Sequence, residues 1–323
     1  MTGPIFPCLL LCLGLAEGGA ASAQPSYPDK PVRLLVGFAA GGSTDKLARV
    51  LATRMTELLG QSVVVDNRPG AAGNLAAETA AAAAPDGYTV FMSTVSSQAI
   101  NPHLYKLRFD PAKVFEPVAL VAKYPLLLVV APQLPVTNVP ELVAHAKNHP
   151  GTTFFASSGS GSPAHLAGEL FKGLAKVQVQ HVPYRGGGPA MLALMSNEAQ
   201  FGFETIPSAI AYARSGKLRG LAVTSDQRSA AMSDLPTMQE AGIAGFSVTS
   251  WAGLVVPAGT PAPVVQRLAR ATQEAIASPA MRSALAADGA QPGGGTPEEF
   301  GRFMREELTA WAEVVRASGA KVD

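Results

Sequence analysis

The sequence has little cysteine, no excess of charge of either sign and no long apolar run in its main part. Its only two cysteines, Cys8 and Cys12, stand near the amino end. Lysine and arginine total 25 against 24 aspartate and glutamate residues, so the charge balance does not favour a nucleic-acid partner. The longest later apolar run, 125–132, has the length of a strand and is too short to cross a membrane.

The first residues predict an export leader. An apolar stretch, Ile5–Leu15, is followed by small residues that end in Ala-Ser-Ala at 21–23, which is typical of a secretory signal with its cleavage site. The basic start of such signals is missing, and leucines before Cys12 disfavour a lipid anchor there. We predict a signal peptide over 1–23 with cleavage near Ala23. Cleavage leaves 300 residues without cysteine, which excludes disulfides and thiol catalysis.

Strand and helix patterns alternate along the rest of the chain. Short apolar runs bounded by turn residues indicate buried strands, and apolar residues three and four apart indicate helices. This alternation predicts parallel sheets covered by helices, an α/β fold. We expect strands at 32–38, 62–65, 88–93, 126–130, 152–156, 177–182, 201–204, 218–224 and 250–256, and helices at 45–59, 74–84, 139–148, 163–174, after 190, and at 264–277, 280–287 and 298–317.

The order of these elements predicts two lobes. No long linker separates them, which favours a chain that crosses between the lobes more than once. Apolar strands near 126–130 and 251–256 are candidates for these crossings. We therefore place one lobe in 24–125 plus 250–323 and the other in 126–249.

Three glycine-rich turns each follow a predicted strand and precede a predicted helix, at Ala40–Asp45, Ser157–Ser162 and Tyr184–Gly188. Helix N-termini beyond the carboxyl ends of strands offer unpaired N–H groups and a partial positive charge, and glycine lets a ligand approach the backbone. Serine and threonine add hydroxyl donors. The three turns together favour an anion cradle, with a carboxylate as the preferred anion, although each alone is also typical of an ordinary turn.

Three other patterns bear on cofactors and metals. The Gly-x-Gly-x-x-Ala motif at 159–164 is typical of dinucleotide binding, but no acidic residue stands about 20 positions on to bind a ribose. The Ser-x-x-Lys motif at 43–46 lacks the companion motifs of serine acyl-transfer enzymes. His145 and His149 are one helical turn apart without further evident metal ligands. We predict no cofactor and no metal.

Charged side chains lie beside the glycine-rich turns. Asp45, at the start of a helix, is most simply a cap or a partner of the helix dipole. Arg185 can pair with a carboxylate and Glu204 can receive a ligand amine, while solvent exposure is an equally ordinary role for both. The competing class of function is a hydrolase or acyl-transfer enzyme with Ser43 or Ser160 as nucleophile.

Several ordered blocks make the chain similar to a known family. It resembles the Bug family, the substrate-binding proteins of tripartite tricarboxylate transporters. The blocks cover nearly the whole mature chain and are YPDKPVRLLVGFAAGGSTDKLAR (27–49), GQSVVVDNRPGAAGN (60–74), PDGYTVFMST (85–94), HVPYRGGGPA (181–190), LRGLAVTSDQR (218–228), LPTMQEAG (235–242) and WAGLVVPAGTP (251–261).

The resemblance implies an exported, non-catalytic receptor. Its fold would be that of a two-lobed periplasmic binding protein, similar to type II, with a mostly parallel sheet in each lobe and a ligand cleft between lobes that close about a hinge. A small carboxylate would be held there by backbone amides, hydroxyls and ordered waters. The implied partners are this ligand and a membrane transporter of the tripartite type. We expect the receptor to be a monomer that serves uptake or sensing in the periplasm.

The family's binding loops fall on identifiable positions of this chain. Three of these positions depart from the family pattern, because Ala40 stands for a usual proline, Arg185 for a common lysine and Glu204 for a frequent aspartate. These differences leave the ligand's identity open. The predicted ligand-binding residues are Phe38, Ala40, Gly41, Gly42, Ser43, Thr44, Asp45, Ala72, Gly73, Asn74, Thr94, Ser97, Ser157, Ser158, Gly159, Ser160, Gly161, Ser162, His165, Tyr184, Arg185, Gly186, Gly187 and Glu204.

Overall fold

The computed structural model of the protein describes residue 3 and residues 27–321. The predicted signal peptide and its cleavage site, apart from residue 3, lie outside the described residues, as do both cysteines. Among the helices of residues 27–321, none has both the length and the apolar character needed to cross a bilayer.

Ten strands of the described residues form one mixed sheet. Their order is β2-β1-β3-β9-β4-β7-β5-β6, and β10 and β8 also pair with β4. Apolar residues fill the central strands, which are buried on both faces. The strands are β1 (Val32–Val36), β2 (Val63–Asn67), β3 (Thr89–Thr94), β4 (Phe115–Val130), β5 (Thr153–Ser157), β6 (Val179–Pro183), β7 (Phe201–Thr205), β8 (Arg219–Val223), β9 (Thr249–Pro257) and β10 (Gln291–Gly294).

Helices cover the sheet, and local signals fix their ends. Gly60 ends α1 in the left-handed conformation, with φ 73°. Thr296 and Glu299 form a capping box at the start of α10. The helices are α1 (Ser43–Leu59), α2 (Asn74–Ala81), α3 (Asn101–Leu104), α4 (Val139–Asn148), α5 (Pro163–Ala175), α6 (Gly187–Met195), α7 (Ile206–Arg214), α8 (Ala262–Ala277), α9 (Pro279–Ala287) and α10 (Pro297–Ser318), with the short helical turns η1 (Ala71–Gly73), η2 (Ser96–Ile100) and η3 (Ala230–Met232).

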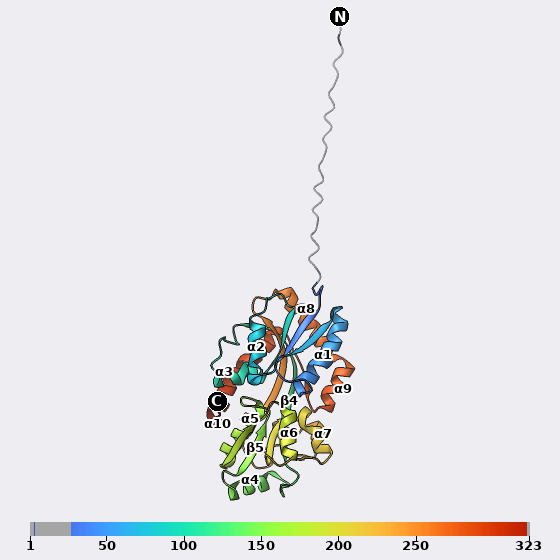
Figure 1. The fold of residues 1–323 in the computed structure, drawn as a ribbon. Coiled ribbons are helices and arrows are strands. Elements are labelled where there is room, and N and C mark those ends of the chain that lie inside the picture. The colour runs from blue at the N-terminus through green and yellow to red at the C-terminus, as the bar shows by residue number, and fades with distance from the viewer. Residues whose placement is uncertain (1–2, 4–26, 322–323) are drawn as a thin grey trace.

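Two lobes are visible in Figure 1, with α1, α2 and α8 in the upper one and α4, α5, α6 and α7 in the lower one. The long strand β4 belongs to both. Its residues Phe115 to Pro125 pair with β9, and from Leu126 onward it pairs with β7 and β8. The change of partner falls between Pro125 and Leu126. We therefore retain the division into 24–125 plus 250–323 and 126–249 as a proposal for the limits of the lobes.

The prediction of mostly parallel sheets holds only for the outer strands. β1 is parallel to β2 and β3, and β5 is parallel to β6 and β7. Every pairing of β4 and β9 is antiparallel. The reason is topological: β4 carries the chain out of the first lobe and β9 carries it back, so the two strands run in opposite directions at the point where they meet.

A buried threonine ties the two crossing segments together. The hydroxyl of Thr224 accepts a hydrogen bond from Leu126 N at 2.7 Å and lies 2.6 Å from Val248 O, to which it donates. Thr224 itself is completely buried. One side chain at the end of β8 therefore joins the outgoing strand to the returning segment.

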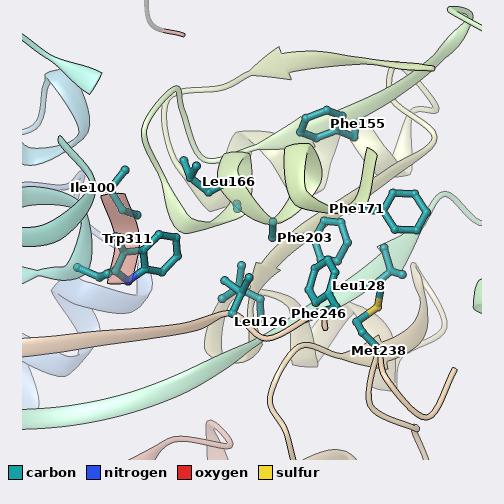
Figure 2. Packing of buried hydrophobic residues seen from close by; sticks show 14 of the residues in the cluster. Ile100, Leu126, Leu128, Phe155, Leu166, Phe171, Phe203, Met238, Phe246 and Trp311 are labelled. Atoms are coloured by element: carbon teal, nitrogen blue, oxygen red, sulfur yellow. The ribbon is translucent and has the colours of Figure 1, made fainter. Parts of the chain in front are cut away.

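The largest apolar core is continuous between the lobes. Figure 2 shows Trp311 of α10 beside Ile100, with Leu126 and Leu166 close by from β4 and α5. Behind this contact, both tryptophans of the chain bind one carboxylate, because Trp251 Nε1 and Trp311 Nε1 donate to Glu307 Oε2 at 2.8 and 3.0 Å. The C-terminal helix thus packs on both lobes near the crossing strands.

Candidate ligand-binding site

A cavity of about 220 Å³ lies between the two lobes. A cavity of this volume suits a short organic acid. The predicted residues that line it are Phe38, Ala40, Gly41, Gly42, Ser43, Thr44, Thr94, Ser158, Ser162, Arg185, Gly186, Gly187 and Glu204. Residues that line it without having been predicted are Ala39, Ser96, Tyr124, Pro163, Gly188, Pro189, Thr205, Ser208 and Ser250.

Two helices on opposite sides of the cavity begin without a capping side chain. Gly42 precedes α1 and Gly186 precedes α6, and neither position supplies a side-chain acceptor for the first N–H groups. Capping side chains begin α4, α5, α9 and α10, whereas α2, α3, α7 and α8 also lack one. What distinguishes α1 and α6 is that their cap residues are glycines that line the cavity. The first turns of α1 and α6 therefore keep unpaired N–H donors and positive ends directed at the cavity.

Asp45 shapes the first of these turns from behind. Its carboxylate accepts from Gly41 N at 2.8 Å, from Arg49 Nε at 3.0 Å and from Asn67 Nδ2 at 3.0 Å. Burial opposes ionisation of Asp45, but the hydrogen bonds from Arg49, Gly41 and Asn67 outweigh it and hold its pKa below the usual value. The side chain does not line the cavity and acts as an anchor of the loop.

The segment Ala72–Asn74 and Ser97 also lie behind the cavity wall. The carbonyl of Ala72 and Asn74 Oδ1 both accept from Asn101 Nδ2, at 3.1 and 2.7 Å. A Cβ on Gly37 would come within 2.7 Å of Gly73 Cα, so this segment braces the loop that follows β1. Ser97 Oγ accepts a hydrogen bond from Thr94 N at 3.1 Å.

The turn from Ser157 to Ser162 presents only some of its residues to the cavity. Ser158 and Ser162 line it, whereas Ser160 and Gly161 contact the first lobe. Tyr105 Oη donates to Ser160 O at 3.0 Å, and a Cβ on Gly161 would lie 2.9 Å from Asn101 Oδ1. This part of the turn makes a direct contact between the lobes.

His165 lies in the core beneath the same turn. Its ring stacks on His181 with centroids 3.9 Å apart, and its Nδ1 accepts from Gly161 N at 3.2 Å. Burial lowers the pKa of His165 to about 4 and that of His181 to about 3, so both rings are neutral near pH 7. Ser157 Oγ lies 2.6 Å from His181 Nε2. These contacts give the buried histidine pair a packing role.

Tyr184 also does not line the cavity. Its hydroxyl instead donates a hydrogen bond to Glu198 at 3.4 Å.

Glu204 is an acidic side chain in a site that otherwise suits an anion. It is the last residue but one of β7 and is 3% exposed. Oε1 accepts from Thr205 N at 2.8 Å, while Oε2 has no hydrogen-bond partner among the described residues. Burial raises the pKa of Glu204 to about 7, against the lowering effects of Thr205 and of the Ser158 hydroxyl, which lies near the carboxyl group without forming a hydrogen bond of good geometry to it. Near neutral pH this carboxyl group is therefore divided between its charged and neutral forms.

Part of the cavity comes from the crossing strands. Tyr124 of β4 and Ser250 of β9 are register partners, and both line the cavity. Thr94 and Ser96 add buried hydroxyls whose oxygens have no partner among the described residues. No glycine-rich turn marks these positions. For Tyr124 and Ser250, the one signal in the sequence was a polar residue just before each apolar strand that we expected to cross between the lobes, at 126–130 and 251–256.

The geometry does not support the enzyme alternatives. Ser43 Oγ accepts from Thr205 Oγ1 at 3.4 Å, a contact across the cavity, and no histidine hydrogen-bonds to it within residues 27–321. Ser160 does not line the cavity. The rings of His145 and His149 stack on each other, and the described part of the chain contains no group of three potential metal ligands.

Comparisons with known proteins agree with one another. A family model described as the tripartite tricarboxylate transporter family receptor, TctC, matches residues 47–320. Protein BugT of Bordetella pertussis is 38% identical over 321 residues, which cover 97% of this chain and 98% of the relative.

Solved structures are similar over the same range. The R. palustris protein Rpa4515 with adipate has a TM-score of 0.89 at 37% identity, and the match covers 92% of this chain and 100% of the other. MatC from Rhodopseudomonas palustris with bound malate has a TM-score of 0.84 at 34% identity, with 90% and 100% covered.

Proposed function

Because the chain belongs to the tripartite tricarboxylate transporter receptor family, as its sequence blocks indicated, we propose that it captures a small carboxylate between its two lobes. Membership of a receptor family places the protein among binding proteins and not among hydrolases. Similar proteins of known structure hold adipate and malate. The ligand of this chain is accordingly an organic acid small enough for a cavity of about 220 Å³.

The observation that carries the proposal is the pair of uncapped helix N-termini on opposite lobes. α1 and α6 direct their first N–H groups at one cavity, and glycine at each cap leaves those groups open to a ligand. One helix N-terminus contributes about 0.3–2 kcal/mol to a bound anion, whereas micromolar binding needs about 8 kcal/mol. Two N-termini, the hydroxyls of Ser43 and Thr94, and Arg185 together approach that value when the lobes close.

The site assignment is tested by the substitution Gly42→Asp. Gly42 has φ −73°, and an added Cβ there meets only Ala39 O, at 3.4 Å, so aspartate fits. Its carboxylate caps α1 and repels an incoming anion. We expect unchanged or higher thermal stability together with at least about tenfold weaker carboxylate binding, which is about 1.4 kcal/mol, in calorimetric titrations.

The matched control is Gly42→Ala, which adds the Cβ without the charge. A screen of mono-, di- and tricarboxylates by thermal shift supplies the ligand, because a ligand at 100 times its Kd adds about 2.7 kcal/mol of stability. Unchanged affinity in Gly42→Asp would remove the site assignment. A screen without any stabilising acid would count against the function itself.

The setting in which the receptor works follows from the same family. We infer a monomer in the periplasm, exported by the leader predicted over 1–23, that delivers its ligand to a tripartite transporter or to a sensor. Light scattering of the purified protein tests the monomer. The mass of the protein recovered from the periplasm tests cleavage near Ala23.

A further inference from the structure

The unpaired oxygen of Glu204 points to the kind of acid that the site selects, an inference that rests on the proposed function. Oε2 lies beside the first residue of α6, since a Cβ on Gly187 would be 2.9 Å from it. The side chain lines the cavity and is 3% exposed. A buried acceptor without a partner is unfavourable, and a ligand that donates a hydrogen bond to it removes that penalty.

We propose that Glu204 selects acids that carry an amino group and disfavours acids with a second carboxylate. The carboxylate of the ligand lies at the N-termini of α1 and α6, and its ammonium donates to Oε2 of Glu204. Among the described residues that line the cavity, Glu204 is the one acidic side chain and Arg185 the one basic side chain. A zwitterion thus finds a complementary charge for each of its two groups.

A second ligand carboxylate meets the opposite situation. In so small a cavity it lies close to the Glu204 carboxyl, and two like charges in a buried site cannot both remain ionised without strong repulsion. Such a ligand binds well only when Glu204 holds a proton. An ammonium binds well only when Glu204 has lost it.

Few other groups near Glu204 titrate around neutral pH. Tyr124 of β4 has its pKa raised, mainly by burial and also by the charge of Glu204, so it stays neutral. His165 of α5 and His181 of β6 have pKa values of about 4 and 3. Arg185 precedes α6 and is positively charged. Three elements packed against β7, namely β4, α5 and α7, carry further ionisable side chains. None of these side chains lines the cavity; they are Glu116, Lys123, Glu169, Lys172, Tyr212 and Arg214.

The two ligand classes therefore respond to pH in opposite ways. Affinity for an amino acid rises as pH rises through 7, because the ligand binds the ionised form of Glu204, and then levels off. Affinity for a dicarboxylate falls as pH rises through 7, because that ligand binds the protonated form. The limiting slope in each case is about tenfold in Kd per pH unit.

Matched probes isolate the charge at the far end of the ligand. We would titrate wild-type protein and Glu204→Gln with 4-aminobutanoate against succinate and with 6-aminohexanoate against adipate, at pH 6 and pH 8. Hexanoate and 6-hydroxyhexanoate complete the longer series. 4-Aminobutanoate and 6-aminohexanoate keep their charges between pH 6 and pH 8. Succinate and adipate are partly protonated at pH 6, so their affinities are calculated from the concentration of the dianion, and Glu204→Gln measures any slope that comes from the ligand alone.

In wild type we expect at least one amino acid to bind about tenfold tighter than its matched diacid at pH 8, with opposite pH slopes for the two. Glu204→Gln removes both slopes, weakens the amino acid and strengthens the diacid. Glu313→Gln, an exposed change on α10, is the control and leaves both slopes intact. If Glu204→Gln does not fold, the wild-type slope of the amino acid alone decides, because the amino acid does not titrate between pH 6 and pH 8.

Three results contradict the inference in distinguishable ways. A diacid that binds equally well at both pH values would overturn the role of Glu204 and leave the proposed receptor function standing. If a hydroxy acid binds as tightly as the amino acid, the site does not select an ammonium group. Glu204 would then accept a hydrogen bond from a neutral donor of the ligand. The absence of binding by every acid, the monocarboxylate included, would remove the receptor function and the inference together.

Discussion

At the scale of single residues, the stacked pair His165 and His181 ties the stability of the fold to pH. Burial keeps both rings neutral, with pKa values of about 4 and 3, whereas an unfolded histidine has a pKa of about 6.5. Below pH 6.5 the unfolded chain binds protons that the folded chain does not. The free energy of unfolding therefore falls as pH decreases from 6.5 toward 4, by up to about 1.4 kcal/mol per pH unit for each histidine.

We expect His181→Leu to reduce by about one the number of protons that the chain takes up when it unfolds at acidic pH, and so to flatten this pH dependence. Urea denaturation of wild type and variant at pH 7.5, 6 and 5 measures it, and the variant should lose less stability than wild type over this range. Glu204 has the opposite effect, because its raised pKa lowers the free energy of unfolding as pH rises from 4.5 toward 7. Wild type and His181→Leu both contain Glu204, so its contribution cancels when the two are compared.

Gln178→Leu is the control for this prediction. Gln178 is exposed just before β6 and carries no titratable group, so its replacement by leucine should leave the pH dependence as in wild type. Parallel pH profiles for wild type and His181→Leu would show that the pair is not kept neutral by the fold.

At the scale of elements, the strands that cross between the lobes depend on Thr224. We expect Thr224→Val to lower the free energy of unfolding by about 1–3 kcal/mol, because valine keeps the volume but leaves the buried N–H of Leu126 without its acceptor. Thr224→Ser retains the hydroxyl and should cost less. Chemical denaturation of the two variants tests this, and an equal loss in both would attribute the effect to packing of the methyl group.

Most elements could be predicted from the sequence because their signals are local. The apolar runs at 32–38 and 152–156 and the proline and glycine turns around them each mark one strand. Non-local elements escaped prediction. The first part of β4, from Phe115 to Pro125, interrupts its apolar residues with Glu116, Pro117 and Lys123, and β10 is rich in glycine; both are strands because neighbouring strands pair with them. The helix α7 was also missed, since Pro207 in its first turn resembles a turn signal.

The candidate site divides in the same way. Its glycine-rich turns could be found because glycine, serine and threonine at a strand end are visible in any single sequence. Tyr124 and Ser250 could not, because their place in the cavity depends on how β4 and β9 pair. The sequence also did not distinguish residues that face the cavity, such as Ser158, from those that brace it, such as Asp45.

At the scale of the whole molecule, we expect direct contacts between the lobes to contribute to ligand affinity. Tyr105 Oη donates to Ser160 O at 3.0 Å across the interface, and neither residue lines the cavity. We expect Tyr105→Phe to weaken carboxylate binding about three- to tenfold in calorimetric titrations, because one hydrogen bond of the closed arrangement is lost.

The control for this change is Tyr212→Phe on α7, since the hydroxyl of Tyr212 makes no hydrogen bond within residues 27–321. It should leave the affinity unchanged. Equal affinity in wild type and Tyr105→Phe would mean that this contact does not distinguish the open from the closed arrangement.

The shared carboxylate of Glu307 gives the protein a built-in optical reporter. Trp251 and Trp311 are the chain's only tryptophans, and both indole groups bind Glu307 beside the crossing strands and away from the cavity. Indole fluorescence depends on nearby charge. We therefore expect movement of the second lobe against this cluster to change the emission when ligand is added, which can be followed without a dye.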